Sequence, residues 1–94
     1  MTLNFVEMLD YYDVPLTLIA EDSNNQKYIC SLCKWPSKEN SDLQYECVTI
    51  SDRQINDYEK GELSLKKIFE YQQSFIGISK DFADTIEIIG HLPQ

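Results

Sequence analysis

Two cysteines at C-x-x-C spacing are the residues whose arrangement most directly suggests chemistry. Cys30 and Cys33 lie in the stretch YICSLCKW, and this spacing occurs in zinc sites and in redox-active dithiols. The stretch contains no glycine and predicts a strand over 27–35 that Pro36 ends. In a strand, residues three apart point to opposite faces with Cα atoms about 10 Å apart, whereas a disulfide needs less than about 7 Å. We therefore expect no disulfide between these cysteines and interpret both as small strand hydrophobes.

The other soft metal ligands are Cys47 and His91, which together with Cys30 and Cys33 make up a possible Cys₃His ligand set. They lack the paired spacing that makes a zinc pattern specific, and the histidine lies near the chain end. The glycines, Gly61, Gly77 and Gly90, are too far apart for a phosphate-binding loop, and no G-x-S-x-G elbow is present. We expect no catalytic residue, no metal and no cofactor.

The charge balance is strongly acidic, because 16 Asp and Glu residues against 8 Lys and Arg give a net charge of −8. Phosphate backbones and anionic membranes attract basic proteins, so we expect neither nucleic acid nor a membrane as a direct partner. A basic protein partner suits this charge, and so does plain solubility. The densest acidic stretch is either a solvated helix surface or a mimic of nucleic acid. It consists of Asp52, Asp57, Glu59 and Glu62, interrupted by Arg53 and Lys60.

Three aromatic residues are candidates for a binding surface. Trp35 stands at the end of a predicted strand beside Pro36, and Tyr11 and Tyr12 are neighbours, of which one tends to face outward in a regular element. Exposed aromatic residues commonly anchor interfaces. The alternative for Trp35 is a position in the core or at its edge, which we favour because tryptophan is mostly buried.

The hydrophobic periodicity predicts a single domain, 1–94, of the α+β class. We expect a mostly antiparallel sheet of about five strands with two or three short helices on one face. The predicted helices are 3–12, one that begins at Ser51, and one capped by Ser64; the predicted strands are 16–22, 27–35, 43–50, 74–79 and 85–89.

Local turn and cap signals mark the boundaries of these elements. Asn24 and Asn25 tolerate positive φ and predict a tight hairpin turn. Ser51 and Gln54 have the spacing of a capping box, in which each side chain bonds the backbone of the other residue. Gly61 is placed to end that helix as a C′ glycine.

Targeting signals are absent from the N-terminal stretch MTLNFVEMLDYYD, which has no basic region. No apolar stretch approaches the roughly 20 residues that cross a membrane. Three cysteines in a chain without a secretion signal predict reduced thiols, and we expect a cytoplasmic protein.

A pattern covering roughly 11–70 resembles an uncharacterised family of small bacterial domains. The matching residues are Tyr11, Tyr12, Asp13, Pro15 and Leu16, followed by Ser51, Gly61, Glu62, Ser64 and Leu65. The sequence departs from the family pattern at the helix start, where Arg53 comes two residues after Ser51 rather than three. The resemblance implies a bacterial, phage or mobile-element origin, and it assigns no activity and no catalytic residue to this chain.

These observations predict a non-catalytic, acidic protein-interaction module, such as an inhibitor, an immunity protein or an antitoxin-like protein. Small proteins of these kinds are often acidic because their targets are basic, which is an argument by analogy. The first alternative is a nucleic-acid mimic that blocks a DNA- or RNA-binding protein. The second is a metal- or thiol-dependent enzyme. Self-association stays open.

Overall fold

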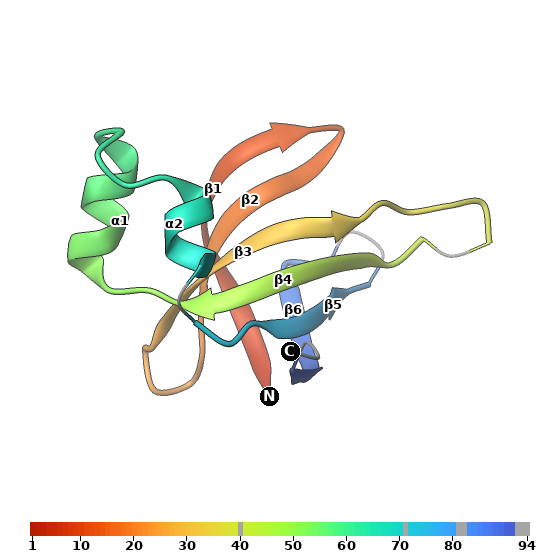
Figure 1. The fold of residues 1–94 in the computed structure, drawn as a ribbon. Coiled ribbons are helices and arrows are strands. Elements are labelled where there is room, and N and C mark those ends of the chain that lie inside the picture. Colours follow the sequence, from red (N-terminus) through yellow and green to blue (C-terminus); the bar gives the residue numbers. More distant parts are fainter. Residues whose placement is uncertain (40, 71, 81–82, 92–94) are drawn as a thin grey trace.

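The described part of the protein is a closed, six-stranded antiparallel β-barrel with two short helices on one side (Figure 1). The computed structural model describes residues 1–39, 41–70, 72–80 and 83–91. The strands are β1 (Thr2–Tyr12), β2 (Val14–Glu21), β3 (Lys27–Lys34), β4 (Leu43–Thr49), β5 (Phe75–Ser79) and β6 (Thr85–His91). The helices, α1 (Asp52–Glu59) and α2 (Leu65–Glu70), lie between β4 and β5.

Each strand pairs with the next one along the chain, and β6 closes the barrel against β1. The closure is short, since its register joins Thr2 to Glu87, Leu3 to Ile86 and Asn4 to Thr85. Two further backbone hydrogen bonds extend it, from the Phe5 amide to the Asp84 carbonyl at 3.0 Å and from the Ile88 amide to the Met1 carbonyl at 2.8 Å.

The predicted α+β fold, with a mostly antiparallel sheet of about five strands, is wrong: the sheet is a closed barrel of six strands, and the predicted helix over 3–12 is strand β1. The two bulges of β1 explain the error. The register with β2 shifts between Phe5 and Glu7 and again between Met8 and Asp10. Each extra residue interrupts the alternation of period two, so the apolar residues of β1 imitate a helical spacing. Phe5 packs against the barrel interior and Leu9 against the outer cluster below the helices, on opposite faces of the strand.

The barrel interior is filled by side chains, as expected for a small barrel. Its buried residues are Leu3, Leu18, Ala20, Tyr28, Cys30, Leu43, Tyr45, Cys47 and Ile86. The interior is tight where β5 passes β6, since a Cβ built on Gly77 would lie 2.3 Å from Cγ2 of Ile86. Glycine at this position therefore lets β5 approach the Ile86 side chain.

A second apolar cluster lies on the outer face of the barrel, below the helices. It comprises the buried residues Ile19, Ile29, Val48, Ile50 and Ile68. Ile55 and Tyr58 of α1, together with Leu65 and Phe69 of α2, pack against it. This packing places one face of each helix against the barrel.

The predicted cap and turn signals are confirmed. The Ser51 hydroxyl accepts a 3.2 Å hydrogen bond from the Gln54 amide, and the Ser51 amide donates a 3.0 Å bond to Gln54 Oε1. Gly61 follows the α1 C-cap with φ of 80°. Asn25 has φ of 64° in the turn between β2 and β3.

The two ends of the barrel differ in what they carry. We call one the open end: it holds the β1–β2 turn at Asp13, the β3–β4 connection and the β5–β6 connection. The other, the helix end, holds the β2–β3 turn and the chain leading into α1 and α2. In Figure 1 the β1–β2 and β3–β4 hairpins project away from the helices. Within the described ranges, neither helix is long and apolar enough to cross a membrane.

Candidate functional site

The two cysteines of the C-x-x-C lie on opposite faces of β3, as predicted. Cys30 is fully buried in the barrel, whereas Cys33 is exposed on the outside. Among the residues that the structure describes, no three Cys, His, Asp or Glu side chains are grouped so as to hold a metal ion. His91 is the last residue of β6, and its side chain lies outside the described part.

The aromatic candidates Tyr11, Tyr12 and Trp35 all lie at the open end. Their exposed fractions are 58%, 69% and 51%. The sequence favours the core or its edge for Trp35, and an exposed fraction of 51% rules out the core. The residue comes directly after the last residue of β3, where the chain leaves the barrel. Tyr11 and Tyr12 reach the same end because β1 turns back into β2 there.

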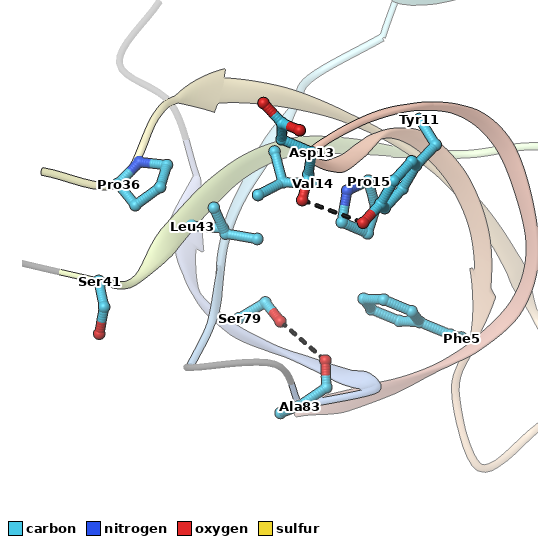
Figure 2. Close-up of a pocket in the computed structure, with 10 residues that line it drawn as sticks. All are labelled: Phe5, Tyr11, Asp13, Val14, Pro15, Pro36, Ser41, Leu43, Ser79 and Ala83. Carbon is cyan, nitrogen blue, oxygen red and sulfur yellow. Dashed lines mark hydrogen bonds between the residues drawn. The ribbon is translucent and has the colours of Figure 1, made fainter.

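Asp13 makes the turn that presents the two tyrosines. It is the single residue between the paired Tyr12 and Val14, and its φ is 62°. The Tyr11 hydroxyl donates a 3.0 Å hydrogen bond to the Asp13 carbonyl. This bond fixes the Tyr11 ring against the turn although the ring is largely exposed (Figure 2).

A cavity of about 210 Å³ opens between the hairpins at this end (Figure 2). Tyr11 and Asp13 of one hairpin and Pro36 of the other line its rim. The remaining lining is mostly apolar: Phe5, Val14, Pro15, Leu43 and Ala83, with Ser41 and Ser79. Sites for drug-sized ligands measure about 300 Å³ or more, whereas a cavity of about 150 Å³ holds a benzene ring. The cavity is therefore the size of one side chain.

Buried hydrogen bonds hold the wall of this cavity. The Tyr45 hydroxyl, inside the barrel, donates a 2.6 Å bond to the Pro15 carbonyl. Burial raises the pKa of Tyr45 well above its usual range, so the phenol stays neutral. The Ser79 hydroxyl donates a 3.3 Å bond to the Ala83 carbonyl and secures the β5–β6 connection.

Two carboxylates accompany the aromatic residues at the open end. Asp10 accepts a 3.0 Å hydrogen bond from the Tyr11 amide through Oδ1. Asp13 bonds Tyr11 through its backbone carbonyl, which leaves its carboxylate at the rim (Figure 2). Neither carboxylate is in an ion pair with a described residue. These two carboxylates therefore suit a cationic group near the cavity.

The acidic candidates Asp52, Asp57, Glu59 and Glu62 lie at the helix end, on α1 and the turn after it. The seven residues of β4 separate the two groups of candidates, a span of about 20 Å at 3.3 Å per residue. Asp52 is paired with Lys27 at 2.8 Å. The structure thus divides the predicted interface residues between opposite ends of the barrel, and the acidic group contains one neutralised member.

Comparison of the chain with protein families, with curated proteins and with solved structures finds no match. The resemblance to an uncharacterised bacterial family therefore stays a prediction. Sequence reasoning missed the cavity, because its lining comes from β1, β2, β4, β5 and the connections of three hairpins. It also missed the register that places Cys30 opposite Cys47.

Proposed function

We propose that this protein is a non-catalytic domain that binds an extended segment of a basic partner protein at the open end of its barrel. The observation that carries this proposal is the grouping of exposed Tyr11, Tyr12 and Trp35 on the two hairpins that border an apolar cavity. Exposed aromatic residues beside a pocket are frequent anchors in protein interfaces. Large apolar surface of this kind is otherwise unfavourable in water.

The size and charge of the site support this class of partner. A cavity of about 210 Å³ accepts one apolar or aromatic side chain. Asp13, which lines the cavity, and Asp10, three residues before it in the chain, favour a Lys or Arg next to that side chain. The net charge of −8 would steer a basic partner toward the protein. The partner segment that we expect therefore carries an apolar residue adjacent to a basic one.

The distribution of reactive side chains supports a non-catalytic role. Cys30 and Cys47 are sealed inside the barrel, and Cys33 lies alone on the outside of β3. The three free thiols favour a cytoplasmic location. Small size and acidity suit an inhibitor, an immunity protein or an antitoxin-like protein of bacterial or phage origin. We propose one of these as the more specific function.

A nucleic-acid mimic is the second candidate, and the acidic residues of α1 favour it. Lys27 neutralises Asp52, and Arg53 and Lys60 interrupt the series. A mimic of a phosphate backbone needs a regular array of unpaired negative charges. The broken array makes this candidate weaker than the first.

Selection from a library of random linear peptides tests the proposal directly. The wild-type protein should select peptides that combine Lys or Arg with a neighbouring apolar residue. Tyr11→Ala and Trp35→Ala should each lower the affinity for the selected peptides by about tenfold or more, because interface anchors contribute about 2 kcal/mol to binding. Affinity should also fall with added salt, because the Debye length shortens from about 10 Å at 0.1 M to 3 Å at 1 M.

The matched control replaces helix-end acids, with Asp57→Asn and Glu59→Gln in one variant. This control should bind the peptides as the wild type does. Loss of binding in the control, with binding retained in Trp35→Ala, would favour the mimic instead. Because Trp35 is half exposed, Trp35→Ala should change the free energy of unfolding by no more than about 0.5 kcal/mol, whereas Leu18→Ala in the core should cost about 2–5 kcal/mol.

A further inference from the structure

Cys30 and Cys47 face each other inside the barrel. They are directly paired in the antiparallel register of β3 and β4, and both are 0% exposed. A hydrogen bond between the two thiols, together with burial, raises the pKa of Cys30 well above its usual value. The two thiols therefore lie in contact at the centre of the molecule.

The geometry of this pair suits a covalent bond. Residues directly opposite in an antiparallel ladder have Cα atoms about 4.5–5.5 Å apart, and disulfides bridge Cα atoms about 4.4–6.8 Å apart. Both side chains belong to the same apolar cluster and thus point to the same side of the sheet. Cys33 cannot substitute for either partner, because it is exposed on the outer face of β3.

We propose that Cys30 and Cys47 form an intramolecular disulfide inside the barrel when the protein folds, or transiently opens, in a medium containing a small-molecule disulfide. The proposal does not depend on the proposed binding function. The product would join β3 to β4 and close a covalent loop around the hairpin connection that carries Trp35.

The reaction is thiol–disulfide exchange. The thiolate of one cysteine attacks glutathione disulfide, which forms a protein–glutathione mixed disulfide and releases one glutathione thiolate. The thiolate of the second cysteine then attacks the protein sulfur of the mixed disulfide and expels the second glutathione. Overall the two protein thiols lose two electrons and two protons, and one glutathione disulfide gains them to become two glutathione thiols.

Access determines the order of events in the folded protein. Cys33 is exposed and should react first with glutathione disulfide. No second thiol lies within its reach on the outer face of β3, so its mixed disulfide with glutathione should persist. Cys30 and Cys47 have a partner but no exposed surface, so the pair should react only when the barrel opens or before it has closed. Redox-buffered refolding is therefore the appropriate experiment.

The test uses the full-length Cys33→Ser variant, refolded in glutathione buffers of graded ratio. The equilibrium constant for the internal disulfide should be about tenfold or more larger under native conditions than in guanidinium chloride, because folding holds the thiols together. Equal or smaller native constants would show that the register does not accept the bond. Accumulation of glutathione on Cys30 or Cys47 in place of the internal bond would also overturn the proposal.

Wild-type protein supplies a second readout that does not depend on the variant. After the same refolding, proteolytic mapping should find Cys30 bonded to Cys47 and Cys33 either free or bonded to glutathione. A bond from Cys33 to either of the others would contradict the proposal. The Cys47→Ser variant is the matched control, and it should form no intramolecular disulfide.

Discussion

The Tyr45 hydroxyl donates a 2.6 Å hydrogen bond to the Pro15 carbonyl across the barrel interior. The bond joins β4 to β2, which are not neighbours in the sheet, and Pro15 also lines the cavity at the open end. One buried phenol therefore links the core of the barrel to the wall of the candidate site.

Replacement of this hydroxyl, by Tyr45→Phe, should lower the free energy of unfolding by about 1–2 kcal/mol, because the Pro15 carbonyl loses a buried partner. Tyr11→Phe is the matched control. It also removes a hydroxyl bonded to a backbone carbonyl, that of Asp13, but at a position that is 58% exposed. Its cost should stay within about 0.5 kcal/mol. Urea unfolding of both variants measures the difference, and equal costs would count against the buried bond.

Alkaline pH should destabilise the protein through its buried tyrosines. Burial raises the pKa of Tyr45 and, together with Asp22, that of Tyr28. Because the pKa is raised in the folded state, the contribution of each neutral tyrosine to the free energy of unfolding is fully present below the unfolded-state pKa of about 10. This contribution is lost as the pH rises toward the folded-state pKa. Unfolding free energies measured between about pH 8 and 11 should fall less steeply for Tyr45→Phe than for the wild type. Parallel curves would contradict the assignment to Tyr45.

Gly77→Ala should destabilise the barrel, because the new Cβ would lie 2.3 Å from the buried Ile86 Cγ2. Overpacking of this kind costs about 1–3 kcal/mol. Gly90→Ala is the control in the neighbouring strand, since its Cβ would meet no atom within 4 Å. Thermal melts should show a lowered Tm for the first variant and an unchanged or slightly raised Tm for the second. A neutral Gly77→Ala would mean that β5 and β6 are spaced more widely than described.

Ser51→Ala should lower the free energy of unfolding by about 1 kcal/mol, because the first turn of α1 loses its N-cap hydroxyl. Gln54→Ala should cost less, since it removes only the reciprocal bond to the Ser51 amide. Denaturant melts of the two variants rank the two halves of the capping box. The reverse ranking would argue that the glutamine side chain, and not the serine, holds the helix start.

Elements with strong local signals could be predicted from the sequence, and β1 could not. The strand 27–35, the Asn25 turn and the capped start of α1 depend on residues close together in the chain. β1 carries bulges that replace simple alternation with a helix-like spacing, and its partners β2 and β6 decide its conformation. The α+β prediction is wrong for this reason.

The candidate site shows the same division. Tyr11, Tyr12 and Trp35 could be singled out because their types are typical of interfaces, but their sequence neighbours do not reveal that they share one end of the barrel. The acidic residues of α1 could equally be singled out, and only the topology places them at the opposite end.

The sequence by itself determined the features that rest on near neighbours: the opposite faces of Cys30 and Cys33, the capping box of Ser51 and Gln54, and the acidic charge. Tertiary structure alone decided the closure of β1 on β6, the pairing of Cys30 with Cys47, and the cavity between the hairpins. The physical reason is that strand pairing joins backbone groups far apart in the chain. Register and bulges set which side chains meet, and no local propensity encodes them.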